Sequence, residues 1–192
     1  QGEIVGYLQY LTESFYSMAS DKKVNLSFKS NLKPIDIDFD EVKIQHIIYN
    51  LLSNAIKFTR PGGKVVLEVK EIQYKNLTHL QITVKDTGVG IEQENLPHIF
   101  DRFYQVERSN SKNGAKTFGG TGIGLALTKE LVELMGGSIF AKSEIGWGTE
   151  FKVLLPKLKG IHTPKMNAVL ETITYSQNDL VPDFESLPKK PD

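Results

Sequence analysis

The sequence has no cysteine, so disulfide bonds, cysteine zinc sites and thiol catalysis are excluded. It also has no excess charge, because 23 basic residues balance 23 acidic ones. Proteins that bind nucleic acid usually carry a basic excess, so we expect no nucleic-acid partner. No apolar run approaches the roughly 20 residues that span a bilayer. We therefore expect no membrane contact by this stretch, and because it starts with Gln1 we expect a longer parent chain.

Glycine and proline are few along most of the 192 residues but are concentrated towards the end. Nine of the 16 glycines lie between Gly114 and Gly148, and four of the eight prolines lie after residue 157. No sustained apolar period follows Gly160. We predict one folded domain over residues 1–157 and a linker or tail over 158–192.

The periodicity of apolar residues predicts an α+β domain. Three- and four-residue spacing indicates helices over residues 3–20, 40–58 and 121–135. Alternation indicates strands over residues 24–29, 35–39, 64–74, 79–85, 138–143 and 149–155. This order predicts one mixed sheet with the helices packed on one face.

Two asparagines interrupt the second predicted helix. Asn50 and Asn54 lie four residues apart, and Lys57 follows on the same helix face. Asparagine is a poor helix former, and such conflicts with local propensity tend to mark functional sites. An amide oxygen suits Mg²⁺ and a lysine suits phosphate. Taken alone, however, this pattern fits a solvated helix face better.

Residues 86–91 (DTGVGI) follow a predicted strand. Asp and Gly often close a β-segment, so simple turn chemistry is one interpretation. The other is a buried carboxylate that accepts a hydrogen bond from an exocyclic amine, with glycines that admit a flat ring close to the backbone.

Residues 119–126 (GGTGIGLA) place four glycines within six residues at the start of a helix. Free backbone N–H groups and the helix dipole then favour a phosphate. No Gly-Lys-Ser/Thr sequence occurs, so this is not a P-loop. Leu127 stands where a Rossmann fingerprint needs its third glycine.

Taken in order, these segments resemble the catalytic, ATP-binding domain of sensor histidine kinases. Residues 50–59 (NLLSNAIKFT) resemble the N box, 86–91 the first glycine box, 99–104 (IFDRFY) the F box, 119–126 the second glycine box, and 146–151 (GWGTEF) the last glycine box. The likeness runs from about residue 3 to Pro156. Each motif alone is weak, but five in the family's order are specific.

The resemblance implies the Bergerat fold, an α/β sandwich with a mixed, mostly antiparallel sheet and about three helices on one face. It also implies ATP and Mg²⁺ as ligands. Asn54 would hold the metal, Asp86 would bind the adenine amine with help from Thr149, and residues 107–118 would form an ATP lid. The residues implied to bind the nucleotide are Asn54, Asp86, Gly88, Gly90, Ile91, Tyr104, Gly120, Thr121, Gly122, Gly124, Leu125 and Thr149. Those implied in phosphoryl transfer are Asn50, Lys57 and Arg102.

The position of Asn50 bears on the reaction, because hydrolysing relatives of this fold carry a glutamate there that activates water. An amide cannot act as a general base near neutral pH. We therefore expect the domain to bind ATP, to hydrolyse it very slowly, and to donate its γ-phosphoryl group to a histidine. That histidine would lie on a dimerisation domain of the same protein before residue 1, with a response-regulator receiver domain as an indirect partner.

None of His46, His79, His98 and His162 has the sequence context of the family's phosphorylated histidine. We therefore expect this fragment not to phosphorylate itself and to be monomeric. Its expected location is the cytoplasmic part of a membrane-bound sensor. Two alternatives stay open at this point: an ATP-binding module that only senses or docks, and a serine kinase of the anti-sigma type with the same fold.

Overall fold

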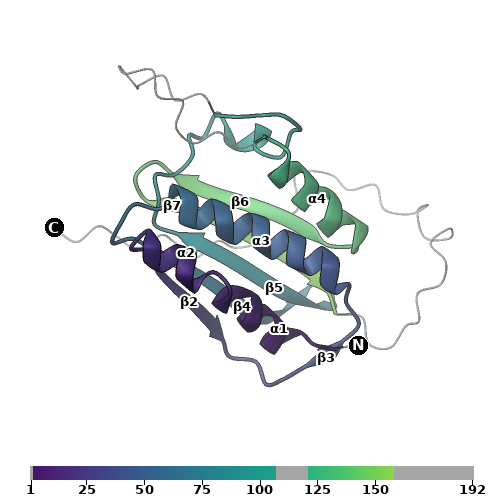
Figure 1. Ribbon diagram of the computed structural model, residues 1–192. Coiled ribbons are helices and arrows are strands. Elements are labelled where there is room, and N and C mark those ends of the chain that lie inside the picture. Colours follow the sequence, from purple (N-terminus) through teal and green to yellow (C-terminus); the bar gives the residue numbers. More distant parts are fainter. Residues whose placement is uncertain (1, 107–120, 158–192) are drawn as a thin grey trace, which may run out of the picture.

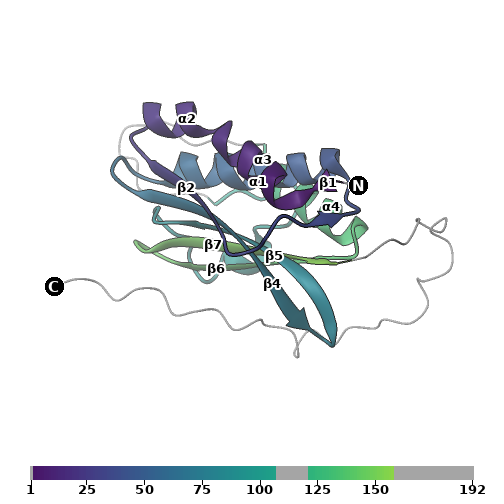
Figure 2. The same ribbon diagram turned by 90° about the horizontal axis from the view of Figure 1, so that it is seen from below.

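The computed structural model describes residues 2–106 and 121–157. Within them, a layer of helices covers one face of a β-sheet, as Figure 2 shows with the helices above the strands. The α+β sandwich that the sequence predicts is thereby confirmed. The expected lid and the expected tail, 158–192, lie outside the described residues.

The main sheet has five strands in the order β2-β4-β5-β7-β6. Its first pair is parallel and the other three are antiparallel. The strands are β2 (Asn25–Ser30), β4 (Lys64–Tyr74), β5 (Leu77–Asp86), β6 (Ser138–Glu144) and β7 (Gly148–Pro156). Because β5 and β7 are neighbours, Lys85 lies opposite Glu150, and residues that end β5 and begin β7 meet at one end of the sheet.

Helix α3 (Glu41–Phe58) runs through the middle of the helical layer (Figure 1). Asp40 caps its N-terminus, since Asp40 Oδ1 accepts a hydrogen bond from Lys43 N at 3.0 Å. Its sheet-facing stripe is buried against the strands and comprises Ile44, Ile47, Ile48, Leu51, Leu52, Ala55 and Ile56. The same helix that forms the core therefore also carries the two asparagines.

The single helix predicted over residues 3–20 is wrong. The structure has two helices there, α1 (Ile4–Glu13) and α2 (Tyr16–Asp21). Ser14 bonds back to Leu11 O, and Phe15 turns inward, with its ring centroid 4.5 Å from that of Tyr49. The break lets a large aromatic side chain enter the core from between the helices.

The strand predicted over residues 35–39 is also wrong in length and place. Only β3 (Asp36–Ile37) forms, and it pairs with β1 (Gly2–Glu3) in a separate two-stranded sheet. Ile35 explains this placement, because it bonds to Glu3 Oε1 and to Ile4 N at the start of α1. The segment is held against α1 instead of joining the main sheet.

Two further boundaries differ from prediction. The β4–β5 turn is only Lys75–Asn76, since both residues have positive φ, and β5 therefore begins two residues earlier than expected. Helix α4 (Gly124–Leu134) begins after residue 121, because Gly122 has φ +69° and its carbonyl accepts from Phe103 N at 2.8 Å. The remaining element is a short 3₁₀ helix, η1 (Leu96–His98).

Within residues 2–106 and 121–157, no helix is both long and apolar enough to cross a membrane.

We expect Leu51→Ala to destabilise the domain by about 2–5 kcal/mol, because Leu51 is wholly buried between α3 and the sheet and its truncation leaves a cavity. Urea unfolding followed by circular dichroism measures this. The control is His46→Ala, at an exposed position on the same helix. It should change the free energy of unfolding by no more than about 0.5 kcal/mol. Equal effects of the two substitutions would contradict the assignment of the core stripe.

Candidate functional site

The side chain of Asp86 lies where β5 ends, and only 5% of the residue is exposed. Its Oδ1 accepts from Gly88 N at 2.7 Å and from Thr149 N at 3.2 Å. No donor in the described part of the chain reaches the second oxygen, Oδ2. One oxygen thus fixes the carboxylate to the loop after β5 and to the start of β7, and the other is left for a ligand that donates a hydrogen bond.

Burial raises the pKa of Asp86 to about 6, against the opposing effect of the two backbone donors. The group is therefore mostly ionised at neutral pH. A partly desolvated carboxylate is a strong acceptor for an amine donor, and a perturbed buried acid at a strand end is typical of a functional site.

Two glycines let the backbone come close around Asp86. Gly148 has φ +111°, and a Cβ there would lie 1.9 Å from the carbonyl oxygen of Asp86. Gly90 has φ +74°, and a Cβ there would lie 2.0 Å from Glu144 O. Any side chain at either position would push the 86–91 loop off the ends of β6 and β7.

Ser143, at the end of β6, is a residue that the sequence analysis missed. Its hydroxyl donates to Gly148 O at 2.7 Å, accepts from Ile91 N at 2.8 Å and contacts Thr149 Oγ1 at 2.9 Å. It therefore joins the first and last glycine boxes. Only the pairing of Ser143 with Thr149 in the β6–β7 register could have revealed it.

Thr149 contacts Asp86 through its backbone N–H, and the help with the adenine amine that the resemblance implies for Thr149 stays a prediction. The Thr149 hydroxyl is engaged with Ser143. Gln93 adds a further bond, from Nε2 to Ser143 O at 2.6 Å. These contacts hold one wall of the site, in which Ile91 is half-buried and packs against the core.

Asn50 and Asn54 lie on the face of α3 that turns towards α4. Asn54 Nδ2 donates to Asn50 Oδ1 at 3.3 Å, and Asn50 Nδ2 donates to Thr128 Oγ1 at 2.7 Å. Thr128 is buried and was not predicted from the sequence. The interpretation of this face as a merely solvated one is wrong, because the two amides are half-buried and hydrogen-bonded to each other.

The asparagine pair leaves oxygen for a cation. The Asn54 amide group commits its Nδ2 to Asn50, so Oδ1 is the atom that could meet Mg²⁺. In the part of the chain that is described, no group of three acidic or histidine side chains could hold a metal ion. A cation here would need its other oxygens from phosphate and water, as is usual for Mg²⁺.

Lys57 lies one turn beyond Asn54, and its ammonium is 5.3 Å from the centroid of the Phe58 ring. The Phe58 carbonyl accepts from Val89 N at 3.3 Å. This backbone hydrogen bond joins the end of α3 to the 86–91 loop. The segment that carries Lys57 is therefore bonded to the segment that carries Asp86.

The second glycine box packs against Asn50 and the F box. A Cβ on Gly124 would lie 2.3 Å from Asn50 Oδ1, and a Cβ on Gly122 would lie 2.7 Å from the Phe103 backbone. Thr121 is exposed and Leu125 is half-buried against the core. Gly120 lies outside the described residues.

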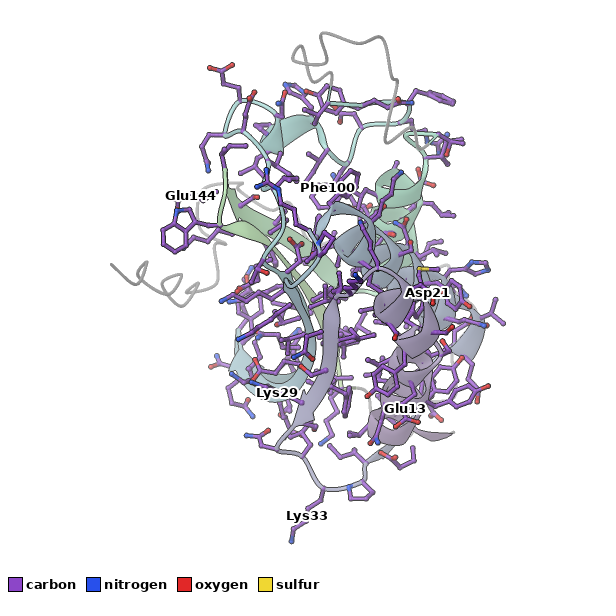
Figure 3. The ribbon with its side chains drawn as sticks, turned by 60° about the vertical axis from the view of Figure 1, so that its left-hand side comes forward. Glu13, Asp21, Lys29, Lys33, Phe100 and Glu144 are labelled. Atoms are coloured by element: carbon purple, nitrogen blue, oxygen red, sulfur yellow. The ribbon has the colours of Figure 1, made fainter. Side chains whose placement is uncertain are left out.

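The F box is held in place by Phe100, labelled in Figure 3, whose ring centroid is 6.3 Å from that of Phe151. Tyr104 donates to Asn95 Oδ1 at 2.6 Å. Arg102 is exposed and reaches Glu130 of α4 through Nε at 2.9 Å and Nη2 at 2.6 Å. In this structure, therefore, Arg102 and Tyr104 bind protein groups instead of joining the asparagines.

We expect Asp86→Asn to stabilise the nucleotide-free domain at pH 8 by about 1–3 kcal/mol, since one pKa unit is about 1.4 kcal/mol. The pKa of Asp86 is raised from 3.8 to about 6, so its ionisation makes the fold less stable as the pH rises through that window. An asparagine keeps the acceptor for Gly88 and Thr149 without the charge. Thermal melts at pH 5 and pH 8 measure the effect.

The matched control for that experiment is Asp21→Asn, at an exposed position at the end of α2, which should leave the difference between pH 5 and pH 8 unchanged. A loss of stability in Asp86→Asn at pH 8 would contradict the cost assigned to the buried charge.

The matching family model and the similar relatives indicate the same family for this chain. Residues 39–159 match the family described as "Histidine kinase-, DNA gyrase B-, and HSP90-like ATPase". The chain is 35% identical over 156 residues to the sensor histidine kinase WalK of Bacillus subtilis, covering 80% of this chain and 24% of WalK. It is 37% identical over 140 residues to the autoinducer 2 sensor kinase/phosphatase LuxQ of Vibrio cholerae, covering 72% of this chain and 16% of LuxQ. The chain thus spans about a quarter or less of these relatives.

Solved structures agree with this. The full-length structure of ShkA in complex with AMPPNP matches with a TM-score of 0.68 and 28% identity, over 80% of this chain and 30% of that one. The nucleotide-free catalytic domain of the histidine kinase ThkA matches with a TM-score of 0.67 and 20% identity, over 81% of this chain and 95% of that one, which shows the shared fold. Both the sequence and the fold place this chain in the histidine kinase-, DNA gyrase B- and HSP90-like ATPase family, as a domain of the sensor histidine kinase type.

Proposed function

We propose that this domain binds Mg-ATP and donates the γ-phosphoryl group to a histidine on a dimerisation domain of the same protein. The observation that carries the proposal is Asp86, a buried carboxylate with one oxygen fixed by backbone donors and the other open to a ligand. The AMPPNP bound to ShkA, a similar protein of known structure, supports the choice of ligand.

At the adenine end, Asp86 Oδ2 would accept the hydrogen bond of the exocyclic amine. A ring bound there needs backbone nearby without side chains, and Gly88 and Gly90 supply it. Gly88 fits between Phe58 O and Asp86 Oδ1, since a Cβ there would lie 2.6 and 2.7 Å from them. Ile91 would contribute the apolar contact of the pocket.

At the phosphate end, Asn54 Oδ1 would hold Mg²⁺ and Lys57 would meet phosphate oxygens. Bound Mg²⁺ supplies positive charge that neutralises the phosphates. Asn50 fixes the orientation of the Asn54 amide through their hydrogen bond, and Thr128 fixes Asn50 in turn. The N-terminus of α4 begins at Gly124, beside Asn50, and its free N–H groups favour an anion.

This arrangement suits transfer to an imidazole better than hydrolysis. Asn50 has no titratable group with which to activate water. A neutral imidazole needs no base to attack, since its nitrogen lone pair forms the N–P bond while the bond between phosphorus and the leaving ADP oxygen breaks. The histidine would come from another domain, and the parent would be a sensor whose catalytic part lies in the cytoplasm and signals to a receiver domain.

We expect Asp86→Asn to weaken binding of Mg-AMPPNP by about 30-fold or more, because the amide can turn a donor towards the adenine amine. Isothermal titration calorimetry on the 192-residue chain measures this, with Asp21→Asn as the control that keeps wild-type affinity. Failure of the wild-type chain to bind Mg-AMPPNP would overturn the proposed function. Unchanged affinity in Asp86→Asn alone would overturn only the adenine assignment.

We expect Asn54→Ala to weaken AMPPNP binding by about tenfold with Mg²⁺ present, and by less than about twofold in EDTA. The amide oxygen that is lost would contact the metal and not the nucleotide itself. The control is Gln45→Ala, an exposed position on the same helix. Equal losses with and without Mg²⁺ would place the metal elsewhere.

A further inference from the structure

Lys22 is a half-buried lysine that neither the family motifs nor the proposed reaction uses. It follows α2, whose last residue, Asp21, is labelled in Figure 3. Its ammonium donates to Ile56 O at 2.8 Å and also to Lys57 O. Both carbonyls belong to the last turn of α3, which is the turn that carries Lys57.

The last turn of a helix leaves carbonyls without intrahelical partners, and each one needs another donor. In α3, Thr59 bonds to Ala55 O through both N at 3.1 Å and Oγ1 at 2.6 Å. Val89 N serves Phe58 O at 3.3 Å. The two carbonyls between these, those of residues 56 and 57, accept hydrogen bonds from the Lys22 ammonium. A cation in this place also interacts favourably with the C-terminal end of the helix dipole.

Lys22 is itself held firmly at the C-terminus of α2. Its backbone N–H donates to Met18 O at 3.3 Å, and the next two N–H groups, of Lys23 and Val24, return to Ser20 O and Ala19 O at 2.8 Å each. Lys23 O in turn accepts from Gly62 N at 2.7 Å. The ammonium therefore extends to α3 from a hydrogen-bonded turn and connects the end of α2 with the end of α3.

We propose that Lys22 is a positioning residue for the phosphate end of the nucleotide site, acting through the backbone of Ile56 and Lys57. The inference rests on the proposed function. Lys22 fixes the turn from which Lys57 projects, and it would not itself touch the phosphates.

The charges support this role. Burial and repulsion from the neighbouring Lys57 ammonium lower the pKa of Lys22 in the nucleotide-free domain. An anionic polyphosphate bound at Lys57 would offset that repulsion. Lys22 should then contribute strongly to the affinity for a ligand that carries phosphates and little to the affinity for a ligand that has none.

The test compares two ligands, Mg-AMPPNP and adenosine, by calorimetry on the 192-residue chain. Lys22→Met should weaken Mg-AMPPNP about fivefold to tenfold while adenosine changes less than about twofold. Lys22→Arg, which keeps the cation and its donors, should stay within about threefold of wild type. Lys23→Met removes the same charge one residue away, at an exposed side chain, and should bind both ligands normally.

Equal losses for the two ligands in Lys22→Met would show a purely structural role, and unchanged affinities would show no role; either result overturns the inference. Should Lys22→Met not fold, Lys22→Gln, compared with Lys23→Gln, must show the same selective loss. Failure of the wild-type chain to bind Mg-AMPPNP would count against the proposed function, whereas wild-type binding with no selective loss counts against Lys22 alone.

Discussion

The hydrogen bonds from Gly88 N and Thr149 N to Asp86 Oδ1 are the contacts on which the rest of the site depends. They join the loop after β5 to the start of β7 and partly compensate for a carboxylate buried at the end of the sheet. A buried charge raises the free energy of the folded state unless something pairs with it. In this domain the second oxygen of Asp86 has no such partner among the described residues, so its charge destabilises the fold. A ligand that donates a hydrogen bond to this oxygen would offset that loss of stability.

Helix α3 connects the two ends of the site. Its apolar stripe forms the centre of the core, its asparagines face α4, and its last turn bonds to Val89 and to Lys22. The residues that we propose for the phosphate end therefore lie on a buried helix and not on a loop. Transfer of a phosphoryl group relies mainly on positioning and charge stabilisation, so a rigid helix would suit the reaction that we propose.

Much of this could be predicted from the sequence. Alternation and helical spacing gave the α+β class and the five strands of the main sheet, because burial of one face imposes a period on the chain. The asparagine pair and the glycines before α4 stood out because they conflict with local propensity, whereas Asp86 by itself also fitted ordinary turn chemistry and gained weight from the order of the motifs. Predictions failed where a tertiary contact overrode the local pattern, as when Phe15 entered the core and split the first helix, or when Ile35 bound the start of α1.

The sequence by itself thus determined the fold class and the residue types of the candidate site. Both follow from local properties of the chain, namely the period of apolar residues and the residues that are unusual in their segment. Only the tertiary structure decided that Ser143 joins two glycine boxes, that Thr128 orients Asn50, and that Lys22 braces α3. These contacts span 52, 78 and 34 positions of the chain. A serine, a threonine or a lysine is unremarkable in its own segment, and its role exists only once packing brings a distant donor or acceptor within hydrogen-bond distance.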